Sequence, residues 1–212
     1  MIRFQSPTAL FLSTKLLEAA FTAAATDIVT VTGHGFVNGD KIRVTTSGGD
    51  LPAGLVINTD YYVKKINANT FYLHSTPDLV SGTQIDVTDA GTGTHTLHLK
   101  SKVAYVKGFR HMNLSWHTAN SANFTAKIQI SDQEDVNFEN AASATNRWTY
   151  VQNITNSDGS TVDGATGITQ DSAGTDENKN FAINLDNTLL VCADITAWVA
   201  GTLDLRVSPA SN

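Results

Sequence analysis

Hydrophobic and polar residues alternate with a period of two along most of the chain. The clearest run is Phe124–Ile130, and the same pattern recurs at Phe181–Leu185 and Leu203–Val207. Alternation of this kind predicts strands with one buried face and one solvent face. Leu189–Ala193 is apolar on both faces, which predicts a central strand covered on each side. Only Thr14–Ala25 would also suit a short helix, so the pattern indicates an all-β fold.

Residues 26–99 show shorter runs separated by sharp turns. Asn38-Gly39 is a hairpin signal, because a type I′ turn needs positive φ at both central positions. We expect six short strands, located at 28–31, 41–44, 61–66, 70–75, near Ile85 and Val87, and at 94–99. Six short strands with regular turns predict a small barrel.

Residues 100–212 favour a different architecture, two packed antiparallel sheets in a β-sandwich of jelly-roll or immunoglobulin-like type. Asn156–Asn180 is rich in Gly, Ser, Thr and Asp, and we expect an extended loop with one short strand. The apolar residues between Ala9 and Leu17 need cover, so an N-terminal strand is expected to join the C-terminal sheet. We therefore expect a discontinuous sandwich domain, residues 1–22 and 100–212, with residues 23–99 inserted as a small β-barrel module.

The N-terminus invites comparison with a secretory signal, because Ala9–Leu12 is apolar and Ala23–Ala25 resembles a cleavage site. Ser13-Thr14-Lys15 interrupts the apolar stretch after four residues, whereas a signal core needs about 7–15. We expect this segment to be part of the fold. No apolar run approaches the roughly 20 residues of a transmembrane helix.

Charge narrows the range of partners. Charged residues make up 16% of the chain, the net charge is −6, and the mean hydropathy is −0.12. A chain with a net negative charge is not attracted to nucleic-acid phosphates or to an anionic membrane by its overall charge. Because the chain contains 1 Cys, it can form neither an intramolecular disulfide nor a cysteine-based zinc cluster. We expect a soluble, mildly acidic protein with neither a nucleic acid nor a membrane as its partner.

A series of short motifs between residues 24 and 98 carries a resemblance to a known module. In order, the motifs are His34–Val44 (HGFVNGDKIRV), Leu51–Leu55 (LPAGL), Thr59–Val63 (TDYYV), Asn69–Leu73 (NTFYL) and Gly91–Thr94 (GTGT). They resemble a module of tailed-bacteriophage virion proteins, which is similar to the small β-barrel half-domain inserted in ubiquitin-activating enzymes. The resemblance implies a barrel fold. The module has no cysteine here, so ubiquitin-type chemistry has no support.

The C-terminal part more loosely resembles β-sandwich domains of phage capsid-associated and tail proteins. The matching segments are Lys127–Asp132, Arg147–Tyr150, Val191–Ile195 and Gly201–Leu203. Together the two resemblances imply a virion structural protein, foremost a capsid decoration or auxiliary head protein on the capsid surface. Its partners would be the major capsid protein or other virion proteins. The alternatives are a neck, tail or fibre component, a carbohydrate-binding module for attachment to a host glycan, and a secreted hydrolase.

The six histidines raise the question of a metal site. His95 and His98 are three residues apart, so on a regular strand they face opposite sides and cannot chelate one ion. His111 and His117 lie further along the chain. We expect surface or loop histidines and no metal ligand, with a site on a symmetry axis between subunits as the remaining alternative.

Acidic residues could in principle bind calcium, which prefers oxygen ligands. The candidates are the cluster Asp132, Glu134 and Asp135 and the loop Asp158–Gly164. The loop lacks both the Asp-x-Asp-x-Asp-Gly run and a glutamate at the twelfth position. We expect a solvated turn, and no cofactor.

No arrangement of residues singles out a catalytic nucleophile, since Ser, His and Asp occur without a Gly-x-Ser-x-Gly elbow. Cys192 lies in the most apolar run and is expected to be a small buried side chain. Trp116 and Trp148 are expected in the core, and Trp198 is expected to be exposed or at an interface. We assign no catalytic, cofactor-binding or metal residue and expect that the protein is not an enzyme.

The two ends of the chain suggest how the protein assembles. Met1–Pro7 and Val207–Asn212 are short and polar, and we expect that they add nothing to a core. Such ends commonly become ordered against a neighbouring chain. The expectation is a homo-oligomer or a lattice-bound subunit.

Overall fold

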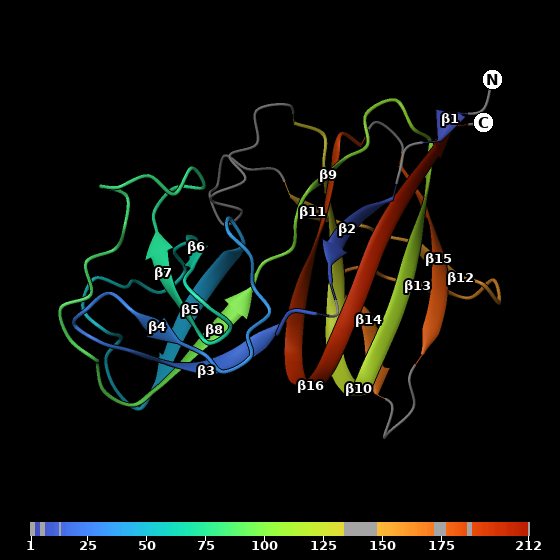
Figure 1. The fold of residues 1–212 in the computed structure, drawn as a ribbon. Coiled ribbons are helices and arrows are strands. Elements are labelled where there is room, and N and C mark those ends of the chain that lie inside the picture. The colour runs from blue at the N-terminus through green and yellow to red at the C-terminus, as the bar shows by residue number, and fades with distance from the viewer. Residues whose placement is uncertain are drawn as a thin grey trace. The chain divides into compact units, whose positions relative to one another are not determined.

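The chain forms strands and, within the residues described, no helix, which confirms the all-β class (Figure 1). The structure is a computed structural model. It describes residues 3–4, 7–12, 14–133, 148–171, 177–185 and 188–211. None of these residues belongs to a helix long and apolar enough to cross a membrane.

Two compact units make up the chain. The sheet unit consists of Met1–Ser13 and Ser101–Asn212, and the barrel unit consists of Thr14–Lys100. The barrel unit is thus inserted between two parts of the sheet unit, and each unit buries its own apolar side chains.

The barrel unit is a closed antiparallel barrel with the strand order β3-β4-β7-β6-β5-β8. The strands are β3 (Glu18–Ala23), β4 (Val29–Thr30), β5 (Lys41–Ser47), β6 (Tyr61–Lys65), β7 (Thr70–His74) and β8 (Thr94–Leu99). Closure gives every strand two neighbours, so the barrel presents no open sheet edge.

One barrel strand differs from the prediction. The sixth strand is Glu18–Ala23, and all of it except Ala23 was expected in the sandwich domain, whereas Ile85 and Val87 lie outside the strands. Phe21 pairs with β8 and is buried in the barrel. Val87 is also buried, but its N–H donates to the carboxylate of Asp27 at 2.7 Å instead of to a strand. The barrel unit therefore begins at Thr14 and not at residue 23.

The two ends of the barrel unit are hydrogen-bonded neighbours. The Leu99 N–H donates to the Leu17 carbonyl at 2.8 Å, and the Lys100 N–H donates to the Lys41 carbonyl at 2.8 Å. Adjacent ends are what an inserted module requires, since the host chain must continue where it was interrupted.

The sheet unit contains one hydrogen-bonded sheet of ten strands. Two long strands, β10 (His111–Ser131) and β16 (Leu190–Ser211), pair antiparallel along nearly their whole length. The other strands are β1 (Arg3–Phe4), β2 (Thr8–Phe11), β9 (Ala104–Tyr105), β11 (Thr149–Tyr150), β12 (Ile154–Asn156), β13 (Thr161–Val162), β14 (Ile168–Asp171) and β15 (Asn178–Asn184). β16 unites the predicted strands at Leu189–Ala193 and Leu203–Val207, and β10 extends well beyond the predicted strand at Phe124–Ile130. The segment between β12 and β15 contains two short strands, where one was predicted.

The long strands fold over at a corner. The β10–β16 register shifts between Ala119 and Asn123, and Asn120 and Ser121 have φ of 62° and 56°. Trp116 and Phe124, on opposite sides of this corner, have ring centroids 5.5 Å apart, although eight residues of straight strand span about 26 Å. The two arms of one sheet therefore face each other as the two layers of a sandwich.

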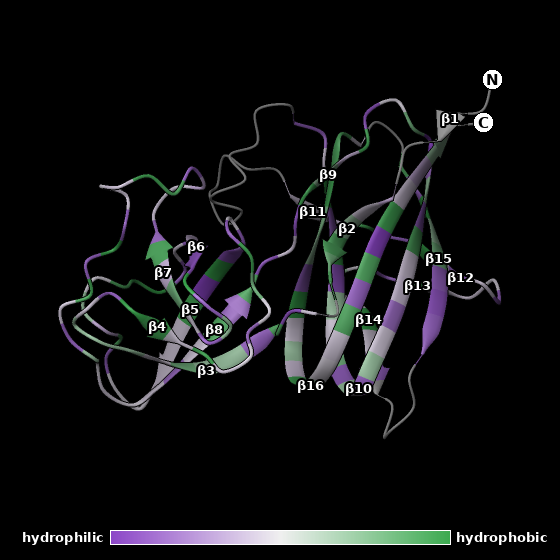
Figure 2. Ribbon diagram, viewed as in Figure 1, coloured by the Kyte–Doolittle hydropathy of each residue, from purple (hydrophilic) through white to green (hydrophobic). Residues whose placement is uncertain are grey.

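Alternation along the strands selects the core of the sheet unit, as the coloured bands on β10 and β16 in Figure 2 show. Within β16, residues 190–193 are buried at all four positions. All four pair with β10, and Leu190 and Val191 also pair with β9. This confirms the central strand predicted at Leu189–Ala193.

Both chain ends belong to the sheet. β2 pairs with β16, so the predicted N-terminal strand joins the C-terminal sheet. β1 pairs with the last residues of β16, with Arg3 opposite Ser211 and Phe4 opposite Ala210. Val207 is fully buried. The expectation that Val207–Asn212 adds nothing to a core is therefore wrong. Oligomerisation stays a prediction.

Candidate functional site

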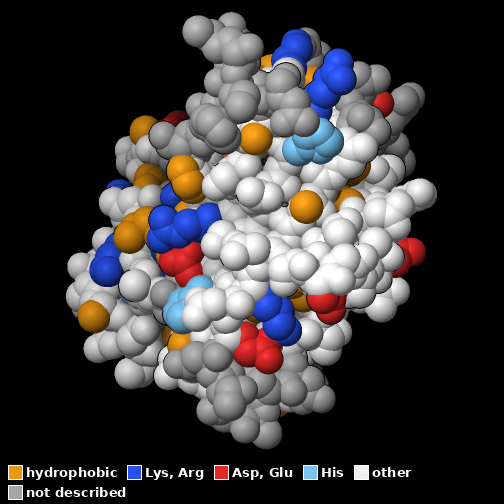
Figure 3. Space-filling model, turned by 90° about the vertical axis from the view of Figure 1, so that its right-hand side faces the viewer, with side chains coloured by type: hydrophobic (Ala, Val, Ile, Leu, Met, Phe, Trp, Pro, Cys, Tyr) orange, Lys and Arg blue, Asp and Glu red, His pale blue; other side chains and the backbone are white. Residues whose placement is uncertain are grey.

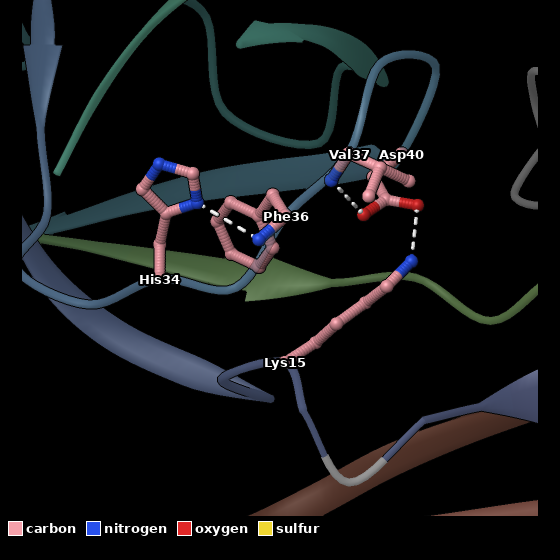
Figure 4. A network of polar contacts seen from close by, with 5 residues as sticks. All are labelled: Lys15, His34, Phe36, Val37 and Asp40. Carbon is pink, nitrogen blue, oxygen red and sulfur yellow. Dashed lines mark hydrogen bonds and ion pairs between the residues drawn. The ribbon is translucent and has the colours of Figure 1, made fainter. Parts of the chain in front are cut away.

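The most specific motif of the sequence, His34–Val44, forms the loop before β5 and the first half of that strand (Figure 4). Its Asp40 accepts a hydrogen bond from the Lys15 ammonium at 2.6 Å, and both side chains are almost fully buried, with exposed fractions of 4% and 6%. The second oxygen of Asp40 accepts the Val37 N–H at 2.9 Å. A buried ion pair with such additional hydrogen bonds holds one geometry.

The His34 side chain holds this loop in place through its hydrogen bonds and ring contacts. The Phe36 N–H donates to Nδ1 of His34 at 2.8 Å, so Nδ1 carries no proton. Nε2–H then donates to the Asn67 carbonyl at 3.1 Å. The ring packs between Phe36 and Phe71, with centroid distances of 4.9 and 5.1 Å. Burial lowers the pKa of His34 below its usual 6.5, although the hydrogen bond to Asn67 acts in the opposite direction. The ring is therefore neutral at pH 7.

The same loop receives the first residues of the barrel unit. The Leu16 N–H donates to the His34 carbonyl at 3.2 Å. Gly35 has φ of +67°, and a Cβ there would lie 1.8 Å from the Thr14 carbonyl oxygen. Together with the Lys15–Asp40 pair, these contacts clamp the segment 14–16 onto the loop.

The remaining polar side chains of the motif are also engaged inside the barrel unit. Asn38 accepts the Lys65 N–H through its side-chain oxygen at 2.8 Å. Lys41 and Arg43 both pair with the buried carboxylate of Asp60, the first at 3.1 Å. The charged and polar side chains of the motif, His34, Asn38, Asp40, Lys41 and Arg43, are therefore all engaged in contacts that stabilise the fold.

Three of the six histidines are buried. They are His34, His74 and His95, with exposed fractions of 0%, 0% and 6%. His34 lies in a loop, as expected, whereas His74 and His95 lie on β7 and β8, so the expectation of surface or loop histidines is wrong for these two. The physical reason is that each ring satisfies a polar group of a neighbouring loop. His95, for example, bonds the Ala90 carbonyl at 3.2 Å.

His74 is held as a neutral ring as well. The Thr83 hydroxyl donates to the Val80 carbonyl at 2.8 Å, so His74 donates its Nδ1–H to the Thr83 oxygen at 2.9 Å. Its buried Nε2 has no hydrogen-bond partner among the described residues. Burial lowers the pKa of His74, and the charge of Lys64 lowers it further.

His95 and His98 lie on opposite faces of β8, as predicted from their spacing. His111 and His117 are exposed on β10. In the part of the chain that the structure describes, no three His, Cys, Asp or Glu side chains are placed to hold a metal ion.

A hydroxyl, an imidazole and a carboxylate do come together on the outside of the barrel. His98 Nδ1 lies 3.1 Å from the Glu18 carboxylate, and Nε2 lies 2.9 Å from the Thr45 hydroxyl. This is the order of contacts in a nucleophile–base–orienter triad. Thr45 and His98, however, lie within the β5–β8 ladder, where the backbone N–H groups pair between strands and cannot converge on an oxyanion. The three residues form a hydrogen-bond chain on a paired strand face.

The loop Asp158–Gly164 is the solvated turn that was predicted. It contains the hairpin between β12 and β13, and Asp158 accepts hydrogen bonds from the Ser160 N–H at 2.9 Å and hydroxyl at 2.6 Å. These bonds lower the pKa of Asp158. Of the other acidic cluster, Glu134 and Asp135 lie outside the described residues.

Cys192 and Trp116 are buried, as predicted. Trp148 is only partly buried, so its assignment to the core is wrong, because it precedes β11 and belongs to no strand. Trp198 is partly buried beside the corner of β16, and none of the three indoles is an exposed platform.

Among the residues that the structure describes, the most exposed aromatic side chains are instead tyrosines, Tyr105 at 53% and Tyr150 at 39%. Tyr150 borders a cleft of about 430 Å³ in the sheet unit. Sequence reasoning singled out the tryptophans and missed this ring. Its only signal was the polar run after it, Gln152-Asn153.

The solvent-facing side of β10, β15 and β16 carries mostly uncharged polar side chains. Its cross-strand rows are Asn113 with Ala182 and Ser208, Ser115 with Asn180 and Arg206, and His117 with Asn178 and Asp204. Arg206 and Asp204 pair with each other at 2.7 Å. Figure 3, which views the molecule from the side of β12 and β15, shows acidic and basic side chains scattered among a larger area of other atoms. This surface offers hydrogen bonds and shape more than charge.

Comparison with known proteins adds little. No family model and no curated protein matches the chain. Among solved structures the chain is similar to the protein in "Crystal structure of PBSX exported protein XepA", with 6% identity, a TM-score of 0.38, and coverage of 100% of this chain and 82% of that chain. At these values the likeness carries no argument about fold or function.

Proposed function

We propose that the chain is a structural protein of a tailed-bacteriophage virion, and specifically a capsid decoration or auxiliary head protein. The observation that carries the proposal is the state of the signature His34–Val44. It resembles a module of virion proteins, and its His, Asn, Asp, Lys and Arg side chains all bond within the barrel unit. A signature that serves only folding supports a role in assembly over a role in catalysis.

We also propose that the protein is not an enzyme and works without a metal or cofactor. The most triad-like group among the described residues, Thr45, His98 and Glu18, lies on a paired strand face without converging N–H donors. Elemental analysis of washed particles is expected to find no stoichiometric transition metal. A stoichiometric metal would contradict this part of the proposal.

The proposed mechanism is mass action. A subunit that binds only the assembled lattice stabilises that state, and a stable contact buries roughly 1,600 Å². The solvent-facing side of β10, β15 and β16, which is mostly uncharged, is the surface we propose for the contact with the major capsid protein or another virion protein. Binding of purified protein to expanded capsids should then change little between about 0.05 and 0.5 M salt, because screening acts only on charge pairs.

Copy number tests the proposal directly. In purified virions a decoration protein is expected at on the order of hundreds of copies, following the symmetry of the shell, as a homo-oligomer or lattice-bound subunit. Gel densitometry against the major capsid protein measures this number. A few to a few dozen copies would identify a neck, tail or fibre component instead, and absence from the particle would overturn the virion role altogether.

A further inference from the structure

Residues 75–87, which follow β7 in the barrel unit (Figure 1), run back along that strand as a strap. The Ser75 N–H donates to the Thr83 carbonyl at 2.7 Å, and the Ile85 N–H donates to the Leu73 carbonyl at 2.8 Å. β6 pairs with the opposite edge of β7. The strap therefore covers the edge of β7 that β6 leaves free.

The His74 side chain ties the near part of the strap to β7. Its Nδ1–H donates to the Thr83 hydroxyl at 2.9 Å, and that hydroxyl donates to the Val80 carbonyl at 2.8 Å. The ring is fully buried, and its Nε2 has no hydrogen-bond partner among the described residues, which include the whole barrel unit. A neutral ring suits this position, whereas protonation would create a buried charge and a second N–H donor without an acceptor.

The strap is strained in its middle and anchored at its far end. Leu79 has φ of 55°, a left-handed conformation that is unfavourable for a residue with a Cβ. At the far end, the Asp27 carboxylate accepts the Val87 N–H at 2.7 Å and the Gln84 side-chain N–H at 2.9 Å. Opening of the near part therefore relieves strain while the far end stays attached.

The titratable groups around His74 come from β6 and from the strap. Tyr62 lies opposite His74 on β6. Burial lowers the pKa of His74 below its usual 6.5 and the Lys64 charge lowers it further, whereas the Val80 carbonyl and the Asp78 charge raise it. The closed strap therefore holds a neutral ring at pH 7, and an opened strap, which hydrates the ring, binds a proton more readily.

We propose that residues 75–84 form an acid-released strap, in which protonation of His74 expels the ring from its buried position and frees the segment from β7. Between pH 6.5 and the lowered pKa of the closed state, the ratio of open to closed straps rises about tenfold for each unit by which the pH falls. From about pH 7.5 to about pH 5 the increase is up to about thirtyfold. Release leaves the Leu73 carbonyl and the Ser75 N–H unpaired, an open edge on a barrel that is otherwise closed.

The inference goes beyond the proposed structural role and does not depend on it. Copy number in the particle tests the structural role, whereas amide exchange in the purified full chain tests the strap. Each can fail while the other holds.

The experiment measures hydrogen exchange of the full chain by NMR at about pH 7.5 and about pH 5. Protection factors are compared, because they correct for the pH dependence of intrinsic exchange. The Ser75 and Ile85 amides are expected to lose protection by up to about thirtyfold at the lower pH. At both pH values they should exchange faster than the amides of the β5–β8 ladder, since the strap opens without the rest of the barrel.

His74→Asn still offers an N–H to Thr83 but carries no titratable ring, so its strap should lose the response to pH. His98→Gln is the matched control, because His98 is a titratable ring on the outside of the same barrel, and it should respond as the wild type does. Thr83→Val removes the acceptor of the His74 bond and should lower the protection of Ser75 already at about pH 7.5.

Thermal unfolding verifies that each variant is folded, and if His74→Asn is not, Thr83→Val decides. Four results would overturn the proposal: strap protection in the wild type that does not change with pH, an equal change in His74→Asn, wild-type protection in Thr83→Val, or strap amides that exchange no faster than the β5–β8 ladder. The last result would mean that the barrel opens only as a whole.

Discussion

Two glycines in the loop before β5 have nearly the same backbone conformation and very different surroundings. Gly33 has φ of +63° and a Cβ there would meet nothing within 4 Å, whereas at Gly35 it would lie 1.8 Å from the Thr14 oxygen. Gly33→Ala is expected to cost about 1–2 kcal/mol of unfolding free energy, the cost of left-handed backbone. Gly35→Ala is expected to cost more than about 3 kcal/mol, because the clamped segment must move. Equal losses in chemical denaturation would show that segment 14–16 does not rest on the loop.

The buried ion pair Lys15–Asp40 lends itself to a double-mutant cycle. Lys15→Met or Asp40→Asn alone leaves one buried group without its partner, which should cost about 3–5 kcal/mol. The double variant removes both charges, and Asn keeps an acceptor for the Val37 N–H. It should therefore recover most of the loss, as measured by urea unfolding of all four proteins. Additive losses would be the contrary result.

The neutral buried histidines make stability depend on pH. In the folded chain the pKa values of His34 and His74 are lowered from 6.5. At a pH between the lowered pKa and 6.5, the unfolded chain therefore binds more protons than the folded chain. Stability then rises with pH. The contribution is complete above about pH 6.5 and is lost as the pH falls below it.

Thermal unfolding between about pH 5 and 8 measures this effect. His74→Asn keeps a donor for Thr83 and cannot titrate, so it should be less stable than the wild type at neutral pH yet lose less stability on acidification. His111→Asn, an exposed position on β10, is the control and should follow the wild type. If the His74→Asn variant loses as much stability as the wild type when the pH is lowered, the buried His74 ring does not cause the pH dependence.

Among the elements, β10 and β16 depend on the corner that they share. Gly201 has φ of +91°, and a Cβ there would lie 2.2 Å from the Ala122 Cα. Gly201→Ala should therefore separate the two strands at the corner and lower the free energy of unfolding by more than about 3 kcal/mol. Gly159→Ala is its control, since Gly159 has φ of +85° with nothing within 4 Å of its Cβ position. That change should cost only about 1–2 kcal/mol.

The corner also explains why one sheet can form both layers of a sandwich. Alternate residues of β10 are buried on both sides of the corner, so the inward face stays the same when the strand changes layer. A substitution that straightened the corner would separate Trp116 from Phe124, which contact each other only because the strand folds over. Loss of near-ultraviolet circular dichroism in Gly201→Ala, compared with Gly159→Ala, would report that separation.

For the whole molecule, the adjacent ends of the barrel unit predict that it can be removed. Replacing Thr14–Lys100 by a short Gly-Ser linker should leave a sheet unit that is β-rich by circular dichroism and unfolds cooperatively. Leu17 and Leu99 are hydrogen-bonded to each other, so the linker closes a short gap, and loop closure costs only about (3/2)RT ln n. The matched experiment expresses Thr14–Lys100 alone, which should also fold. An unfolded sheet unit beside a folded barrel would mean that the host needs its insertion.

The sequence by itself determined the class of the fold and much of its interior. A period of two assigns each side chain to one face whatever the strand pairs with, which is why Phe124–Ile130 and Leu189–Ala193 were placed correctly. It also predicted an inserted barrel and a turn at Asn38-Gly39. The type I′ hairpin expected there is wrong, because Asn38 does not have positive φ and β5 pairs with β6 and β8 instead of with the strand before the turn. The motif His34–Val44 indicated a barrel before any contact of its side chains was known.

Only the tertiary structure decided which segments meet. Glu18–Ala23 closes the barrel in place of Ile85 and Val87, because strand pairing joins residues far apart in sequence and alternation is silent about the partner. The buried histidines depend on loops that bring carbonyls to their rings. The cleft at Tyr150 joins β10, β11 and residues 184 and 188, and no spacing in the sequence encodes that meeting. Local pattern sets which way a side chain points, and long-range packing sets what it faces.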